Sequence, residues 1–256
     1  AVMKNGFALK FASKDLKNDK EVVLAAVKQN CWALYHASDD LKKDREVYLA
    51  AVEQYGELLE FACDDLKNDK EVVLAAVKQF GFALKFASED LKNDIEVVLA
   101  AVKQYGFALE FASEDLKNDK AVVLSAVKKH GFALEFASED LKKDRAVVLA
   151  AVKQYGDALR FASEDFKPFL SAYSQLSFLV NHKLINSTKN NHATRLLDEC
   201  EELFLNNQLP ISELKAVLYK TNEFINDPDN KNVVSGYEQF ISDAVKNDRP
   251  GMQLLG

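Results

Sequence analysis

A repeat of 25 residues constrains the fold of this chain more than any other feature of its sequence. One position is leucine in six successive copies and Phe166 in the seventh: Leu16, Leu41, Leu66, Leu91, Leu116 and Leu141. A helical unit this short cannot bury its own apolar face, so consecutive copies must stack around a continuous core. The period therefore predicts an all-α protein, an α-solenoid built from two-helix repeats.

Residues 70–88 illustrate how each unit is expected to fold. The longer helix is predicted to follow Asp69, whose side chain can accept hydrogen bonds from first-turn N–H groups. It is predicted to end before Gly81, because glycine tolerates the left-handed conformation that commonly follows a last helical turn. Apolar residues at i, i+3, i+4 and i+7 share one face of this helix: Val73, Ala76, Val77 and Phe80. A shorter helical segment is expected over 82–88.

The repeat array is predicted to cover residues 1–165, in about six to seven copies. Its first residues align with 76–81, the end of a long helix, so the chain is expected to be an N-terminally truncated piece of a larger protein. In residues 166–256 the repeat is lost, and Pro168 suits the first turn of a new helix. Four apolar stripes follow, starting at Phe169, Leu196, Ile211 and Val233. They predict a C-terminal helical bundle that caps the solenoid.

Composition argues against several classes of function. Only 9 Gly and 4 Pro in 256 residues favour helices over sheet or disorder. The formal net charge of -7 argues against nucleic-acid binding, which depends on a basic surface. No run of about 18 apolar residues occurs, so no membrane span is expected. Three widely spaced cysteines, an odd number, favour a reducing compartment over a disulfide framework.

Two stretches resemble known proteins. The motif L-K-N-D-x-E-V-V-L-A-A-V-K-Q-x-G-x-A-L-x-F-A-S, which recurs through residues 1–165, resembles the domain of unknown function 4116 family. That family of helical repeats occurs in bacterial secreted effectors and in large protist proteins, and has no agreed activity. The segment GYEQFISDAVKNDRPGMQLLG, at 236–256, is similar to a C-terminal pattern of effectors that Legionella-type bacteria inject by type IV secretion. Together these resemblances imply a virulence effector secreted by a bacterium into the host cytoplasm.

No catalytic residue is predicted, and no metal or cofactor is expected. Gly-rich phosphate loops, HExxH and CxxC motifs are missing, and the four histidines lack metal-ligand spacing. Cys31 and His36 could form a thiol and imidazole pair, but five residues along a helix place them on different sides. The acidic pairs that recur once per repeat are interpreted as turn formers and caps, because neighbouring pairs about 10 Å apart cannot share one ion.

The second repeat departs most from the consensus, in the segment NCWALYHASDD at 30–40. Cys31 replaces the usual glycine, and Tyr35 stands in a column that is otherwise charged and therefore expected to be exposed. Trp32, Tyr35 and His36 are related by i+3 and i+4 spacing, so they are expected to share one helix face. Trp and Tyr are enriched at binding hot spots. These three residues are therefore candidate partner-binding residues.

Acidic residues extend this candidate site. Residues 30–69 contain ten acidic and four basic side chains. Three of the acids stand out: Glu53 replaces a lysine, Glu57 replaces an aromatic residue, and Glu60 lies one turn from Glu57. An acidic strip beside aromatic rings would suit a host protein with a basic surface or peptide, with charge mainly steering the encounter. The alternative is that these repeats have drifted, or pack against a domain outside this sequence.

The predicted function is recognition of a host protein by a module without chemistry of its own. The alternative is a fragment that positions the substrate of a larger effector enzyme, whose catalytic part precedes residue 1. Recruitment to a membrane through residues 166–256 is disfavoured, because that segment has no polybasic run. The sequence makes no prediction about oligomeric state.

Overall fold

The structure, a computed structural model, describes residues 5–181, 187–206 and 224. Throughout these residues the regular elements are helices and no strand occurs, which confirms the all-α class. The chain divides into two compact units, Ala1–Ser138 and Glu139–Gly256. The sequence repeat does not stop at this division, because its 25-residue pattern continues to Phe166 in the second unit.

Each regular repeat contains three helices, one more than predicted. The copy that starts at Gly81 consists of a 3-10 helix, η4 (Gly81–Phe86), a one-turn helix, α6 (Glu89–Lys92), and a long helix, α7 (Ile95–Gln104). The other elements of the first unit are η1 (Gly6–Phe11), α1 (Lys14–Lys17), α2 (Lys20–Gln29), η2 (Cys31–His36), α3 (Arg45–Val52), η3 (Gly56–Phe61), α4 (Asp64–Lys67), α5 (Lys70–Gln79), η5 (Gly106–Phe111), α8 (Glu114–Lys117), α9 (Lys120–Lys129) and η6 (Gly131–Phe136). Repeat two lacks the one-turn helix and has a turn at 39–42 instead.

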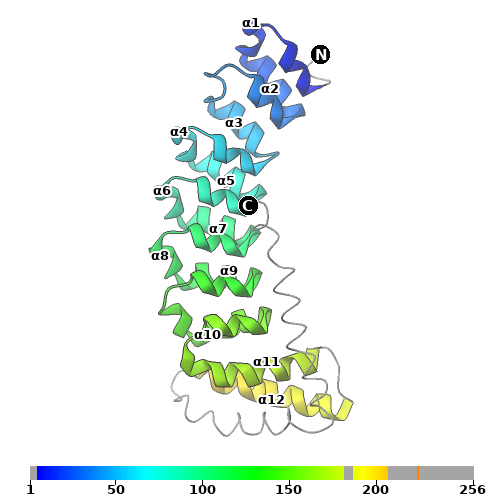
Figure 1. Cartoon of the computed structure of the whole chain (residues 1–256), viewed down its shortest axis with the longest axis vertical. Helices are drawn as coiled ribbons and strands as arrows, with labels where there is room; N and C mark the ends of the chain where they lie inside the picture. The colour runs from blue at the N-terminus through cyan, green and yellow to red at the C-terminus, as the bar shows by residue number, and fades with distance from the viewer. Residues whose placement is uncertain (1–4, 182–186, 207–223, 225–256) are drawn as a thin grey trace. The chain divides into compact units, whose positions relative to one another are not determined.

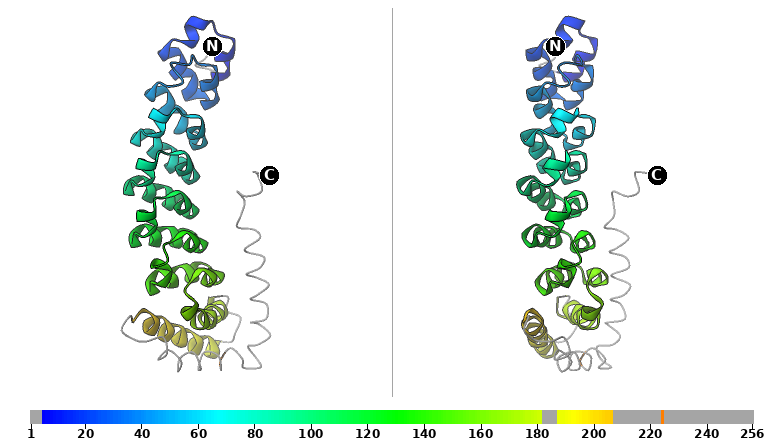
Figure 2. Two further views of the ribbon diagram at one scale, coloured as in Figure 1. Left: turned by 60° about the vertical axis from the view of Figure 1, so that its left-hand side comes forward. Right: turned by 90° about the vertical axis from the view of Figure 1, so that its left-hand side faces the viewer.

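The first unit is a stack of these repeats. Its long helices α2, α3, α5, α7 and α9 pack against one another in chain order (Figure 1). The 3-10 helices form a second layer beside them (Figure 2). The side chains between the layers are buried; in α5 they are Val72, Val73, Ala76 and Val77. This arrangement confirms the predicted repeat solenoid, with small side chains allowing neighbouring helices to pack closely.

Aspartate caps begin the long helices, as predicted. Asp69 Oδ1 accepts hydrogen bonds from the backbone N–H groups of Glu71 and Val72, both at 3.0 Å. The same carboxylate lies 2.6 Å from the guanidinium of Arg45 in the preceding repeat. Burial alone would raise the pKa of Asp69, but the bonds from Arg45 and from the two N–H groups outweigh it and lower that pKa. The caps Asp44, Asp69 and Asp94 therefore each start a helix and also pair with a basic residue of the preceding repeat.

The glycines that begin η1, η3, η4 and η5 are required by space and not by backbone conformation. The residue after α5 is Phe80, which is extended with φ -143°, and Gly81 does not adopt a left-handed φ. A Cβ at Gly81 would lie 2.6 Å from the carbonyl oxygen of Ala101, near the end of the long helix of the same copy. Our prediction of a left-handed residue after the helix is therefore wrong. Glycine instead lets the 3-10 helix pack against the end of the long helix in the copies that begin with Gly6, Gly56, Gly81 and Gly106.

A serine and an asparagine link one regular copy to the next. Ser113 Oγ donates to Asn93 Oδ1 at 2.6 Å, and the backbone N–H of Ser113 donates to the carbonyl of Lys92 at 3.0 Å. The equivalent side-chain bonds join Ser38 to Asn18, Ser88 to Asn68 and Ser138 to Asn118. The link sits at the one-turn helix, where the serine also caps the first turn.

The second unit completes the repeats and adds two longer helices. Its elements are η7 (Leu141–Lys143), α10 (Arg145–Gln154), η8 (Gly156–Phe161), η9 (Glu164–Phe166), α11 (Lys167–Asn181) and α12 (Ser187–Leu205). Helix α11 packs on α10, η8 and α12. The first two predicted stripes are confirmed by the buried Phe169, Tyr173, Leu196 and Phe204. The stripes that begin at Ile211 and Val233, and the segment 236–256, lie outside the described residues, apart from Phe224.

Candidate partner-binding surface

Repeat two, residues 31–55, differs from the regular copies in its backbone as well as its side chains. Its long helix α3 has 8 residues, whereas α5 and α7 each have 10. Cys31 carries the Cβ for which the regular copies leave no room. The last turn of α3 therefore cannot pack as tightly on the start of η2 as α7 packs on Gly81. Helix α3 ends at Val52, and residues 53–54 form a turn.

A glutamine changes its hydrogen bonds at the same place. In repeat four, residues 81–105, Gln104 Oε1 accepts a hydrogen bond from the backbone N–H of Gly81 at 2.7 Å. In repeat two, the side-chain amide of Gln54 instead donates to the carbonyls of Val27 and Ala50, at 2.6 and 3.1 Å. The cysteine therefore alters the closure of the whole repeat.

The junction between repeats two and three is also weaker than the regular junctions. Lys43 stands where the linking asparagine belongs, and Cys63 replaces the serine. Among the described residues, neither the side-chain link nor the backbone bond from residue 63 to residue 42 is formed. Helices η2 and η3 make fewer close backbone contacts than the other neighbouring 3-10 helices of this unit. On the side of the long helices, Arg45 still pairs with Asp69 and Glu71.

Aromatic side chains occupy this opened junction. The rings of Trp32 and Tyr35 are stacked, with centroids 5.7 Å apart and planes 8° from parallel. Trp32 also contacts Tyr55, with ring centroids 5.1 Å apart, and the rings of Tyr35 and Phe61 meet edge to face at 6.1 Å. Trp32, Tyr35 and Phe61 remain 39%, 46% and 61% exposed. We call Trp32, Tyr35, Tyr55 and Phe61 the aromatic surface.

The 3-10 form of η2 decides which predicted residues come together. Side chains at i and i+3 eclipse in a 3-10 helix, which explains the stacking of Trp32 on Tyr35. His36 is turned away from them, and its ring lies 6.4 Å from that of Phe7. The expected shared face therefore includes Trp32 and Tyr35 but not His36. Burial, and then the charges of Lys10, Lys17 and Lys42, lower the pKa of His36.

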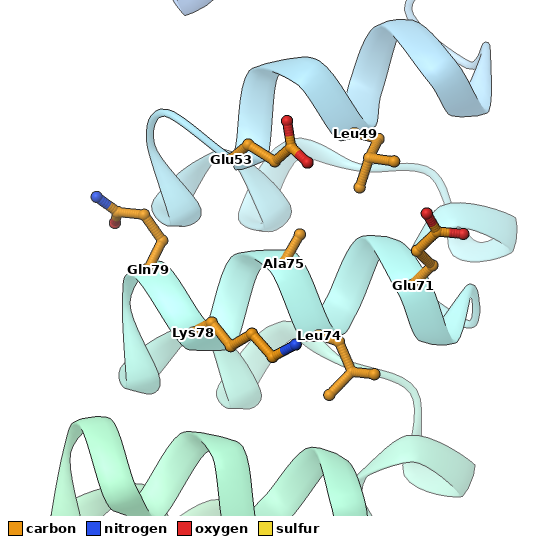
Figure 3. Close-up of a pocket in the computed structure, with 7 residues that line it drawn as sticks. All are labelled: Leu49, Glu53, Glu71, Leu74, Ala75, Lys78 and Gln79. Carbon is orange, nitrogen blue, oxygen red and sulfur yellow. The ribbon is translucent and has the colours of Figure 1, made fainter.

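The three predicted acids lie in two different places. Glu57 accepts a hydrogen bond from the hydroxyl of Tyr55, and Glu60 is an exposed neighbour of Tyr35. Burial, and then the charge of Glu60, raise the pKa of Tyr35. Glu53 instead lines a groove between α3 and α5 with Leu49, Glu71, Leu74 and Lys78 (Figure 3). The structure therefore brings Glu57 and Glu60, but not Glu53, to the aromatic surface.

Two features of this surface were missed from the sequence. Phe61 was not predicted, because phenylalanine is the usual residue in its column; its ring is exposed, as is that of Phe11, whereas Phe86, Phe111 and Phe136 are partly buried. Tyr35 also bridges η2 and η3, so its ring contributes to packing across the junction.

Tyr48, which replaces a valine, is buried, and its hydroxyl donates to the carbonyl of Leu58 at 2.6 Å. Tyr48 therefore belongs to the core.

The geometry offers no support for catalysis by Cys31 and His36. The thiol of Cys31 is buried, and burial raises its pKa, whereas a nucleophilic cysteine needs a lowered one. Across residues 5–181, 187–206 and 224, no three His, Cys, Asp or Glu side chains are grouped to hold a metal ion. In that same part of the chain no helix is both long and apolar enough to span a membrane.

The fold and its links define a helical repeat protein whose irregular junction exposes aromatic rings. The family described as "Domain of unknown function (DUF4116)" matches residues 1–42, 19–67, 44–92, 69–117 and 119–167. The chain belongs to this family, as its repeat motif predicted. Neither the curated proteins nor the solved structures contain a match to it.

Proposed function

We propose that this chain recognises a partner protein through the aromatic surface. The observation that carries the proposal is the shared exposure of Trp32, Tyr35 and Phe61 in one cluster at a junction within the array. In the copies that start at Gly81, Gly106 and Gly131, the rings in the columns of Trp32 and Phe61 are partly or fully buried, whereas Phe7 and Phe11 of the first copy are exposed as single rings. Large aromatic rings with polar tips supply much of the binding energy of protein interfaces. The partner we propose is a host protein in the host cytoplasm, reached by secretion of this chain from a bacterium.

The test is capture of partners from host-cell cytosol by the intact chain, followed by mass spectrometry. Proteins retained by the wild type are compared with those retained by the double variant Trp32→Ala, Tyr35→Ala. We expect the specific partner to be lost, because truncating interface hot spots costs about 2 kcal/mol or more each.

The matched control is Phe82→Ala with Lys85→Ala, which changes the same two positions in a regular repeat. Circular dichroism should first establish that both variants remain helical. We expect the control to retain the partner. Equal capture by the wild type and by the Trp32, Tyr35 variant would refute the assignment of this surface.

A further inference from the structure

In several repeats a basic side chain lies over a phenylalanine ring of the same 3-10 helix. In repeat four the ammonium of Lys85 lies 5.4 Å from the ring centroid of Phe82 and 5.9 Å from that of Phe86. In repeat one Lys10 lies 5.8 Å from the ring of Phe11. All three distances fall within the range of a cation–π interaction. A basic residue directly before the last phenylalanine therefore places its charge over the ring.

The second unit contains the same pair in an independent copy. The guanidinium carbon of Arg160 lies 4.6 Å from the ring centroid of Phe161. Arginine thus occupies this position as well as lysine, and does so at a shorter distance.

Repeat three breaks this pattern. The residue before Phe61 is Glu60, so this copy lacks the basic residue that covers the ring in repeats one and four. Two other copies also have glutamate there, at Glu110 and Glu135, but their phenylalanines meet rings of the preceding copy. Phe82 contacts Phe111 edge to face at 5.0 Å, and Phe107 contacts Phe136 in the same way at 6.4 Å.

No such cover reaches Phe61. The equivalent ring of the preceding copy is Trp32, and it is stacked on Tyr35 instead. Within the part of the chain that the structure describes, the ring contact of Phe61 is the edge-to-face one with Tyr35, and Phe61 remains 61% exposed, while Phe111 and Phe136 are partly buried. Among the described residues Glu60 makes no ion pair. The exposed ring of Phe61 is therefore next to the Glu60 carboxylate, which has no ion pair within the described residues.

We infer that the aromatic surface receives an arginine side chain of the partner, with the guanidinium over Phe61 and paired with Glu60. The inference rests on the proposed function, because it names the group that this surface would bind. Arginine fits better than lysine, since its planar cation stacks on a ring while its N–H groups bind a carboxylate. The partner side chain would take the place that Lys85 and Arg160 occupy in their own repeats.

The probe for the test is a nona-arginine peptide added to the full chain. Trp32 is the only tryptophan, so its fluorescence reports directly on this surface. We expect a saturable change in emission for the wild type. Phe61→Leu, which removes the ring without changing the charge, should weaken binding by about tenfold, as expected for loss of a partly desolvated cation–π contact.

A second variant supplies the cation from within the chain. Glu60→Lys gives repeat three the same Lys-Phe pair that repeat four has, so the variant is compatible with the fold. The ammonium of the new lysine should lie over the ring of Phe61, compete with the peptide for that ring, and reduce peptide binding by tenfold or more. Glu110→Lys makes the same change of charge at the same position of repeat five, and Phe111→Leu makes the same change of ring. Both controls should bind the peptide within about twofold of the wild type.

The results separate the two proposals. Binding that depends on Phe61 and Glu60, with both controls unaffected, supports the arginine site. Unchanged binding in Phe61→Leu, equal losses in the repeat-five controls, or no fluorescence response overturns it. The capture experiment with the Trp32, Tyr35 variant uses other residues and another readout. If the peptide result is negative but the Trp32, Tyr35 variant no longer captures the host partner, the arginine site is refuted and the proposed function stands.

Discussion

The junction between repeats two and three and the junction between repeats four and five are built from the same positions with different residues. In the regular junction Ser113 is bonded to Asn93, and Gly81 lets the preceding copy close tightly. In the irregular junction Cys63 faces Lys43 without such a bond, and Cys31 prevents closure. Aromatic rings fill the opened space and stay partly exposed. The difference teaches that a few small side chains keep the rings of this repeat covered.

The largest effect is expected from exchanging the closing residue between the two regions. Gly81→Cys should destabilise the protein by about 2 to 3 kcal/mol, because the new Cβ would overlap the carbonyl of Ala101. Cys31→Gly should change stability by no more than about 1 kcal/mol, since α3 already ends early. Urea denaturation under reducing conditions measures both.

Hydrogen exchange should localise the first effect to the last turn of α7. If Gly81→Cys were as stable as the wild type, the steric explanation of the short helix α3 would be wrong.

A smaller effect is expected from restoring the missing link. The double variant Lys43→Asn, Cys63→Ser should gain about 1 kcal/mol, the usual net value of one hydrogen bond. Cys63→Ser alone should already gain the cap bond that serine makes to the first turn of the one-turn helix. The additional gain from the link should appear only when both residues are changed, because each single change leaves its partner unable to form that bond.

The mirror variant is Asn93→Lys with Ser113→Cys, which should remove a similar amount from the regular junction. A double-mutant cycle by urea denaturation checks both pairs. Simple additivity of the single changes at residues 43 and 63 would show that the link does not form there.

The smallest effect concerns pH and His36. The pKa of His36 is lowered in the folded chain, so the unfolded chain binds the proton more tightly. Stability should therefore fall as the pH drops from about 6.5, the usual histidine value, through the folded pKa. His36→Phe places the usual residue of this column beside Phe7 and should remove this part of the dependence.

The measurement is the urea midpoint of the wild type and of His36→Phe between about pH 7.5 and pH 5. The other histidines are common to both proteins and cancel in the difference. A difference that stays constant over this range, or one in which the wild type gains stability on acidification, would contradict the expected sign.

Much of the fold could be predicted from sequence because its signals are local. The cap at Asp69 and the valines of α5 lie within one helix, and helix geometry alone puts those valines on one face. The third helix of each repeat was missed, since a single turn such as α6 leaves no apolar period to detect. The role of Gly81 was misjudged because the atom that crowds it, the carbonyl oxygen of Ala101, lies 20 residues away.

The candidate site was only partly predictable for the same reason. Trp32 and Tyr35 were found because they break a column of the repeat, and Glu57 and Glu60 because they add charge to it. The position of Glu53 in the groove between α3 and α5 depends on where α3 ends, which the sequence pattern does not reveal. Phe61 carries no sequence signal, since only its neighbours in space distinguish it from Phe111.

The sequence by itself determined that this protein is an all-α array of 25-residue repeats of a known family, because period and residue type act over a few neighbouring residues. The tertiary structure alone decided which rings are exposed and which acids accompany them. Exposure depends on contacts between successive copies, and a change of one side chain at Cys31 or Cys63 alters those contacts without altering the repeat. The stacking of Trp32 on Tyr35 and the partial exposure of both rings and of Phe61 are therefore a property of packing.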